Sequence, residues 1–554
     1  GSLFFPGWVS SWLFWVSIYL VTRSATYSTR AVKTKITGKL VRMKKFILMN
    51  ADIWTGSPRQ PGAEALVAED GRIVHIGTSA EIAAEIAPGD EVLDAKGRRV
   101  VPGFIDTHVH FTLTGLGHLV INLDGVDSLQ AVQERLRLHH ERYPGDSLLL
   151  ALNFQPELNP QKRFPTPEEL DVACGGRPVY VMDRSAHWSA VNRAAFALLD
   201  MPADTPGVLR DEAGQFTGVL TDQPNTAALE QFWQLFSRQV GLKTAIQKAS
   251  HEAVRGGITT VHALEEWPSV PTLLSYEPVL PVSLVIYSQT RKVSAVCEAG
   301  LRQIGGCGSV MLDGDFSPHT AALLEPYTDA PHQHGTLYYE DNELYEYILQ
   351  AHLNGLQVAL HSVGSAAIEQ LLRAYERVLR EHPRKDHRHR IEHFELPAPG
   401  HAERAKKLGL CLALQPAFNH FWPHHGEYPS VIGPDRARMV DPLGSLVKEG
   451  LTVAIGSDSP VTPMNPMLSI HSAVNHSNPS ERVDVETALR LATQAGAYLA
   501  FEEGIKGTLE VGKRADLVVL SEDPLQVAPE RLREIEVLWT VNQGNIVYTA
   551  GEGE

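Results

Sequence analysis

The stretch Val101–His110 constrains the fold more than any other part of the chain, because two histidines close a short apolar run. Its sequence is Val-Pro-Gly-Phe-Ile-Asp-Thr-His-Val-His. Residues two apart on a strand face the same way, so His108 and His110 can both bind one metal ion. Both lie where the strand should end, and β/α barrels carry their chemistry at the carboxyl ends of their strands. The stretch therefore predicts the first strand of a metal-binding barrel.

Three later segments have the same form, an apolar run of strand length that ends in a possible metal ligand. These ligands are His361, His393 and Asp458. The intervening stretches 366–381 and 402–408 have the composition of helices, as crossovers between parallel strands require. A single histidine means little among the 24 in the chain. Four histidines and an aspartate in one alternating pattern predict a metal centre built on strand ends.

These residues resemble the amidohydrolase superfamily. The motifs that carry the resemblance are Pro102–His110, Ile391-Glu-His393 and Gly456-Ser-Asp-Ser-Pro460. Three further segments are similar to the branch that contains YtcJ-like proteins and N-substituted formamide deformylase, amidohydrolase family 3. They are residues 313–327, 357–364 and 504–520. The resemblance runs from about residue 45 to the C-terminus and implies a metal-dependent amidohydrolase.

We expect an α/β fold, a (β/α)8 TIM-like barrel with an inserted α/β subdomain and a small β-sandwich built from N- and C-terminal segments. The sandwich should comprise 44–103 with 505–554, and the barrel 104–504 with the insertion at about 125–250. Turn signals between short strand patterns support the sandwich, which the resemblance also implies. The expected barrel strands are 104–110, 259–263, 281–287, 309–313, 356–361, 389–393, 411–415 and 451–457.

The expected metal ligands are His108, His110, His361, His393 and Asp458. Zinc prefers imidazole and carboxylate ligands and leaves a position for water in catalytic sites. A divalent ion held in this way activates water near neutral pH. Asp458 is placed to take the proton of that water as general base, the role that the resemblance implies for it. His393 is either a ligand of a second metal or a hydrogen-bond donor to the attacking water.

The resemblance also implies a lysine four residues before Asp313-Gly314, which bridges two metals once it is carboxylated. This chain has Ser309 at that position, and a serine cannot be carboxylated. We therefore expect one ion, zinc or another divalent metal, in preference to two. Glu265 or Asp313 would have to bridge for a second ion to be held.

Other residues are expected to face the substrate. His187 is either an oxyanion-type donor to a substrate carbonyl or a cap on the following helix, and Arg184 in the same segment is expected to contact substrate. His319 stands where relatives often have arginine, and Gln415 closes the seventh strand. The aromatic and histidine-rich run 418–428 is a lid over an apolar substrate or a packed surface loop.

These features predict a hydrolase that cleaves a C–N bond, other than a peptide bond, in a small amide, carbamate or cyclic amide. A deaminase of the same superfamily is the alternative, because one metal with His393 and a base also suits deamination. A non-catalytic barrel that serves as an interaction module is a third hypothesis. It is disfavoured because such proteins lose metal ligands, whereas this chain keeps all five candidates.

Composition bears on the class of binding partner and on the cellular compartment. The chain is 43% hydrophobic and 21% charged, as in a globular protein, and its net charge of −16 argues against a nucleic-acid partner. Its cysteines form no C-x-x-C pair and are expected to be reduced, mostly buried thiols. They are Cys174, Cys297, Cys307 and Cys411. We expect a small-molecule substrate, a homo-oligomer and a cytoplasmic location.

Residues 1–43 form an apolar and basic extension that differs from the rest of the chain. Leu3–Val21 is nearly free of charge, and residues 23–45 carry eight Lys or Arg. Residues 3–22 could cross a bilayer with the basic flank on the cytoplasmic side, which makes a membrane anchor the alternative location. A cleaved signal peptide fits less well, because the basic n-region is missing. We favour a tag or upstream extension that is dispensable to the fold, since the first methionine is Met43.

Removal of residues 1–42 should leave a folded and active protein, because the expected sandwich, the barrel and all five ligand candidates follow this segment. The measurement compares kcat/KM, metal content and Tm of the truncated and the full-length protein. Fractionation of the full-length protein between membrane and soluble material separates an anchor from a dispensable extension. Loss of folding or of metal on truncation would show that the apolar segment packs into the core.

Overall fold

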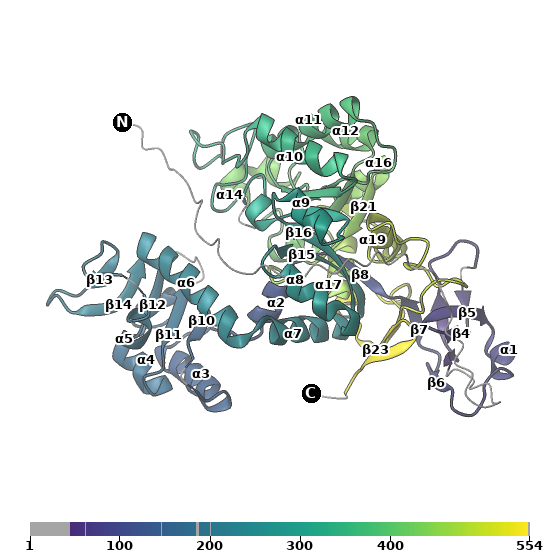
Figure 1. Cartoon of the computed structure of the whole chain (residues 1–554), viewed down its shortest axis with the longest axis horizontal. Helices are drawn as coiled ribbons and strands as arrows, with labels where there is room; N and C mark the ends of the chain where they lie inside the picture. Colours follow the sequence, from purple (N-terminus) through teal and green to yellow (C-terminus); the bar gives the residue numbers. More distant parts are fainter. Residues whose placement is uncertain are drawn as a thin grey trace, which may run out of the picture. The chain divides into compact units, whose positions relative to one another are not determined.

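The computed structural model describes residues 45–551, apart from 61, 146, 184–187, 200 and 427. At the centre of Figure 1, eight parallel strands form one sheet in the order β21-β20-β19-β18-β17-β16-β15-β8. The two edge strands meet, because the Asp458 N–H donates to the His108 carbonyl (2.7 Å) and the His110 N–H donates to the Ser459 carbonyl (2.9 Å). The sheet thus forms the expected TIM-like barrel. Its strands are β8 (Phe104–Val109), β15 (Ile258–Glu266), β16 (Ser283–Gln289), β17 (Gln303–Gly306), β18 (Gln357–Ser362), β19 (Arg390–His393), β20 (Cys411–Leu414) and β21 (Thr452–Ile455).

Seven of the eight expected barrel strands are confirmed to within a few residues, and the fourth is wrong. The prediction of 309–313 followed the apolar run Val310-Met-Leu312, but residues 308–310 form a 3-10 turn and β17 lies earlier, at Gln303–Gly306. The sequence Gln-Ile-Gly-Gly has little β-propensity of its own. Packing requires a glycine at position 305, since a Cβ on Gly305 would lie 1.9 Å from the Ala359 carbonyl oxygen on β18.

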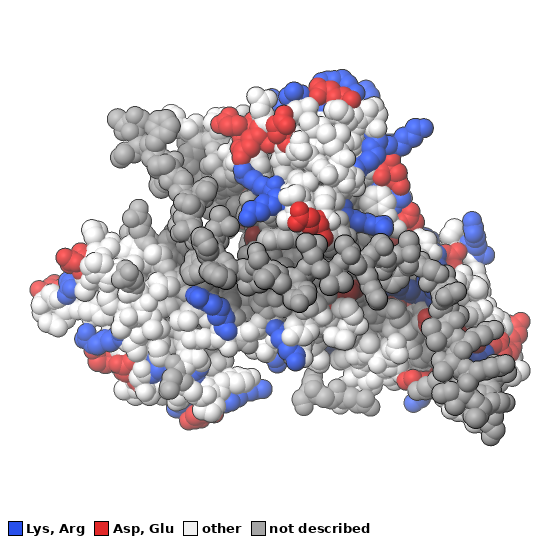
Figure 2. Space-filling model, viewed as in Figure 1, with Lys and Arg blue, Asp and Glu red and all other residues white. Residues whose placement is uncertain are grey.

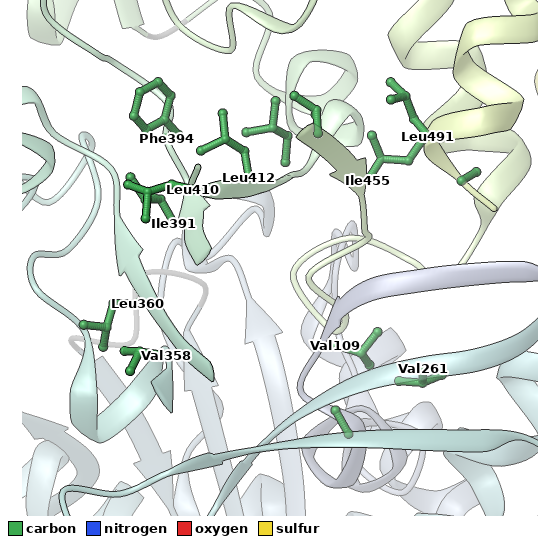
Figure 3. Close-up of a cluster of buried hydrophobic side chains, with 14 of the residues drawn as sticks. Val109, Val261, Val358, Leu360, Ile391, Phe394, Leu410, Leu412, Ile455 and Leu491 are labelled. Atoms are coloured by element: carbon green, nitrogen blue, oxygen red, sulfur yellow. The ribbon is translucent and has the colours of Figure 1, made fainter. Parts of the chain in front are cut away.

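Apolar side chains on the outer face of the strands pack against the helices that surround the barrel. Val358, Leu360, Ile391 and Leu412 belong to one buried cluster, part of which is drawn in Figure 3. Because side chains alternate along a strand, the residue after Leu360 faces the opposite way, into the barrel. The surrounding helices are α7 (Leu242–Arg255), α10 (Asp341–Leu353), α11 (Ser365–Glu381), α12 (His401–Leu408) and α16 (Leu443–Glu449).

Between α2 (Phe111–Gly117) and α7 the chain forms an inserted subdomain around a six-stranded sheet of order β13-β14-β12-β11-β10-β9. Its helices are α3 (Leu129–Arg142), α4 (Pro167–Cys174), the short α5 (Arg193–Phe196) and α6 (Asp222–Val240), and α4 begins with a capping box of Thr166 and Glu169. The strands are β9 (Ile121–Asn122), β10 (Leu149–Phe154), β11 (Val179–Asp183), β12 (Trp188–Val191), β13 (Val208–Arg210) and β14 (Phe216–Thr221).

Segments from the two ends of the described chain share a sheet beside the barrel. The C-terminal strand β22 (Leu517–Leu520) pairs with β7 (Arg99–Pro102) on one side and with β23 (Val537–Asn542), yellow in Figure 1, on the other. This sheet has the order β24-β23-β22-β7-β2-β3, with β24 (Asn545–Thr549), β2 (Asp52–Trp54) and β3 (Gly62–Ala63). A four-stranded sheet has the order β5-β4-β1-β6, and its buried apolar side chains form one cluster with those of the six-stranded sheet. The four-stranded sheet comprises β5 (Arg72–Gly77), β4 (Ala65–Glu69), β1 (Phe46–Met49) and β6 (Glu91–Asp94). The face-to-face stacking of a β-sandwich stays a prediction.

Surface charge and helix length bear on the expected partners. In Figure 2 acidic and basic side chains are interspersed among uncharged ones, so the described residues of this face form no continuous field of one sign. Within residues 45–551 as described, no helix is both long and apolar enough to cross a bilayer. The extension considered above as a membrane anchor lies outside the described residues.

Three buried histidines form a hydrogen-bonded group near the start of β19. The hydrogen-bond partners of these rings determine which nitrogen of each neutral histidine carries the proton. The Val358 N–H donates to His389 Nδ1 (3.0 Å), so His389 Nε2–H donates to His352 Nδ1 (2.9 Å). His387 Nε2–H donates to the Leu408 carbonyl (3.0 Å), and its ring stacks on His389. Burial lowers the pKa of His389 well below its usual value and that of His387 to about 4.

The free energy of unfolding should therefore fall as the pH is lowered below 6.5, the ordinary histidine pKa. The folded-state pKa of His387 is depressed, so the unfolded chain binds more protons between pH 6.5 and about 4. This contribution is complete above pH 6.5 and is lost as the pH approaches 4. The measurement is urea unfolding at pH 7.5, 6.0 and 5.0.

His387→Gln tests the assignment, since it removes one titrating group and should flatten the pH dependence of unfolding. The exposed His332 provides the control, because His332→Gln should leave that dependence as in the wild type. An unchanged slope in His387→Gln would show that other groups cause the acid sensitivity.

Candidate metal centre

Four histidines, a cysteine and an aspartate meet at the carboxyl ends of the barrel strands. They are His108, His110, Cys307, His361, His393 and Asp458. Their ligand atoms form three overlapping sets, and within each set these atoms lie within 4.8 Å of one another. The sets are His108/His110/Cys307, Cys307/His361/His393 and His108/His393/Asp458. All five ligands expected from the sequence thus come together, and the structure adds a sixth.

The aspartate lies between the two histidines of the first strand. Asp458 Oδ1 is 3.3 Å from His108 Nε2 and 3.3 Å from His110 Nε2. The rings of His361 and His393 face each other with centroids 4.4 Å apart, and the His108 ring is 4.8 Å from that of His393. Ligands from β8, β18 and β19 and from the turn after β21 therefore enclose one small space.

Sequence reasoning missed Cys307, which it treated as a structural thiol. Cys307 Sγ lies 3.3 Å from His108 Nε2, 3.4 Å from His361 Nδ1 and 3.4 Å from His393 Nε2. Cys307 directly follows Gly305-Gly306, the end of the fourth strand, and a residue that follows a barrel strand is a candidate ligand. The prediction placed the fourth strand at 309–313, so Cys307 was not recognised as such a residue.

Ser309, on which the expectation of one ion depended, hydrogen-bonds to Glu266. Its N–H and its hydroxyl donate to the Glu266 carboxylate (3.0 and 2.9 Å). Among the described residues, neither alternative bridging group belongs to the three ligand sets. Glu265 accepts the Thr112 N–H (2.6 Å), and Asp313 accepts three backbone N–H groups. Cys307, by contrast, belongs to two of the three sets of candidate ligands.

Electrostatics hold the thiol and the carboxyl in their ionised forms. Burial by itself would raise the pKa of Cys307, but the charges of His108, His361 and His393 lower it well below its usual value. Burial likewise opposes ionisation of Asp458, and the neighbouring His108 and His110 bring its pKa well below the ordinary range. Thiolate and carboxylate are the forms that bind metal.

The donor set fits a divalent metal ion. Sulfur, imidazole nitrogen and carboxylate oxygen are the ligands that zinc prefers. Asp458 Oδ1 is buried and accepts no well-aligned hydrogen bond, although two imidazoles lie beside it. An unsatisfied buried carboxylate oxygen is costly, and a bound cation removes that cost.

A buried ion pair fixes the orientation of His108. Its Nδ1–H donates to Glu392 Oε2 (2.7 Å), which directs Nε2 toward the ligand cluster. Arg390 holds Glu392 through Nε and Nη2, both at 2.8 Å, and also donates to the Thr107 carbonyl (2.8 Å). Such a partner on the second ring nitrogen sets the tautomer of a metal-binding histidine.

The other expected site residues are spread more widely. His319 Nε2 binds the Asp329 carboxylate (2.9 Å), outside the ligand sets. Gln415 is buried at the start of α13 (Pro416–Phe421), with its Oε1 lacking a hydrogen-bond partner. From the aromatic run, Phe418 stacks on His393 with centroids 6.1 Å apart, whereas Phe421 is 46% exposed. Two further expectations, Arg184 and His187, lie outside the described residues.

A model of the amidohydrolase family matches residues 91–548, most of the chain. The chain belongs to the amidohydrolase family. YtcJ of Bacillus subtilis is 29% identical over 88% of this chain and 96% of its own length. N-substituted formamide deformylase of Arthrobacter pascens is 26% identical over 92% of this chain and 99% of its own. An uncharacterised metal-dependent hydrolase from Pyrococcus furiosus has a solved structure with TM-score 0.73 and 28% identity, covering 87% of this chain and 100% of that one.

These comparisons confirm the family and the branch that the sequence motifs indicated. The amidohydrolase is a metal-dependent hydrolase, and the three ligand sets at the strand ends are its candidate metal centre. Its fold agrees with that of the Pyrococcus enzyme over nearly the whole described chain.

Cys307→Ser should lower metal affinity at least about tenfold, because even the partners of metal ligands contribute 10–100-fold. Cys411→Ser is the matched control, since Cys411 is also a buried barrel cysteine but belongs to none of the three sets. The measurement is bound zinc per chain by mass spectrometry after dialysis at a series of free zinc concentrations. Equal zinc binding by Cys307→Ser and the wild type would remove Cys307 from the ligand set.

Proposed function

We propose that this amidohydrolase cleaves the C–N bond of a small amide, carbamate or cyclic amide by hydrolysis, with Asp458 as general base. The observation that carries the proposal is the buried Asp458 carboxylate, 3.3 Å from two ligand histidines at the centre of the strand ends. The similarity to an N-substituted formamide deformylase over 92% of the chain supports an amide as substrate.

The ligand cluster would supply the metal chemistry. A divalent ion such as zinc, held there, lowers the pKa of water and polarises a substrate carbonyl. Cys307 stands both in the set with His108 and His110 and in the set with His361 and His393. We therefore propose that Cys307 would hold metal together with the histidines of both sets, while one ion in preference to two stays the prediction. His393 then acts as a ligand, since its Nε2 faces the Cys307 sulfur (3.4 Å).

Asp458 would move one proton during the reaction. Its lowered pKa keeps the carboxylate ionised and able to accept a proton from the attacking water. As the C–O bond forms and the C–N bond breaks, that proton passes to the leaving nitrogen and Asp458 is ionised again. The carboxylate is held in place for both transfers, because its own N–H is bonded to the His108 carbonyl (2.7 Å).

Substrate positioning would come from residues around the ligands. Gln415 Oε1 is buried without a partner and can accept an N–H of the substrate. His187 and Arg184 stay proposals as carbonyl donor and substrate contact, and His319 as a recognition residue at greater distance. Phe418, stacked on His393, would exclude water on that side.

Asp458→Asn should lower kcat by about 10²–10⁴-fold, the usual contribution of a general base, while the fold is kept. The assay uses N-formyl, N-acyl, carbamate and cyclic amide compounds, with amine and acid products quantified together and bound zinc measured on the same samples. The exposed Asp341 supplies the control, since Asp341→Asn removes a carboxylate at the start of α10.

Near-normal kcat in Asp458→Asn with zinc bound would assign the proton transfer to another residue. Release of ammonia from amino-substituted heterocycles, with no amide cleaved, would support the deaminase alternative.

A further inference from the structure

A cavity adjoins the candidate metal centre on the side of the inserted subdomain. Its volume is about 1040 Å³, and it is bounded by the carboxyl ends of β8, β15 and β16, by α2 and by the junction between α6 and α7. His110 lines it, and so does Gly308, which follows Cys307. Two residues thus connect this cavity to the ligand cluster. No step proposed above uses it.

The size of the cavity exceeds what a formyl or acetyl group needs. Ligand pockets of about 300–1,000 Å³ enclose most of a drug-sized molecule. The remainder of a substrate, apart from the reacting bond, would have to fill it. The cavity therefore suits a substrate with a large substituent on one side of the scissile bond.

The walls of the cavity are mainly apolar. Leu113, Leu116, Trp233, Leu242 and Tyr276 line it. Leu113 is 37% exposed, although its neighbours on both sides along α2 are buried. Leu113 thus adds open apolar surface to the other apolar side chains that line the cavity.

Four charged side chains also line the cavity, Arg238, Lys243, Glu265 and Glu266. Both carboxylates already accept hydrogen bonds from the protein, Glu265 from the Thr112 N–H and Glu266 from Ser309. A charged substituent would lose its hydration against the mainly apolar walls, so a neutral group fits better.

The wall formed by α2 is held in place by close packing. A Cβ on Gly115 would lie 1.8 Å from the Ala245 carbonyl oxygen, so α2 and α7 are in backbone contact. The cavity is therefore a formed pocket and does not need a rearrangement of this wall to admit a ligand.

We propose that this pocket binds a large, neutral, apolar substituent of the substrate, an alkyl or aryl group, and so selects which amide is cleaved. The inference rests on the proposed amide hydrolysis. It predicts that selectivity resides in the non-reacting part of the substrate, where burial of each CH2 group strengthens binding.

The test measures kcat/KM for N-substituted formamides with methyl, butyl, hexyl and benzyl groups, and for 6-aminohexyl and 5-carboxypentyl analogues. We expect kcat/KM to rise about fourfold for each buried CH2 group, because burial of one CH2 contributes about 0.8 kcal/mol. Both charged analogues should fall at least about tenfold below hexyl. Equal kcat/KM across the neutral series would overturn the proposal.

Two variants sharpen the result. Leu113→Asp should lower kcat/KM for the hexyl compound at least about tenfold more than for the methyl compound. Val172→Asp is the matched control, because Val172 is an 82% exposed apolar residue on α4 outside the pocket, and both rates should stay at the wild-type level. A parallel fall for both substrates in Leu113→Asp would contradict a role in selectivity.

Calorimetry with 4-phenylbutan-1-ol, which has no bond to hydrolyse, separates this inference from the proposed function. Binding that Leu113→Asp weakens and Val172→Asp does not would support the pocket even if no amide is cleaved. Cleavage of the formamides without length dependence or alcohol binding would leave the hydrolase standing and refute the pocket.

Discussion

The ion pair between Arg390 and Glu392, with neither side chain exposed, is the interaction on which the rest of the site depends. It joins the sixth barrel strand to the first through His108 and the Thr107 carbonyl, and to the second through His262. Removal of one partner from such a pair costs about 3–5 kcal/mol, because the other charge is left buried and alone. Orientation of a metal ligand and cohesion of the barrel therefore share one set of hydrogen bonds.

Close backbone approach gives the centre its small size. A Cβ on Gly456 would lie 2.6 Å from the His108 nitrogen, and one on Gly305 would meet the neighbouring strand. Only glycine lets the last strand approach the first so closely, and Asp458 follows two residues later. The separation between carboxylate and imidazoles is thus a property of the main chain, which side-chain repacking alone does not alter.

Much of the fold and the grouping of five candidate ligands could be predicted, because each expected ligand closes an apolar run and each run is a barrel strand. Cys307 could not be found in this way, since its strand reads Gln-Ile-Gly-Gly and a lone cysteine resembles a core residue. The single ion expected from Ser309 stays a prediction: counting back from Asp313 crosses a 3-10 turn, and the Ser309 hydroxyl donates to Glu266. The apolar pocket was also invisible, because its walls come from helices far apart in the sequence.

The helix α2 begins directly after His110 and reaches the pocket within its first turn, at Leu113. A change that tilts this helix would move a candidate metal ligand together with the pocket wall. The wall at the junction of α6 and α7 carries none of the six candidate ligands. On the proposal made above, a substitution at this junction would change substrate preference without touching the candidate ligands, whereas a change in α2 would affect both.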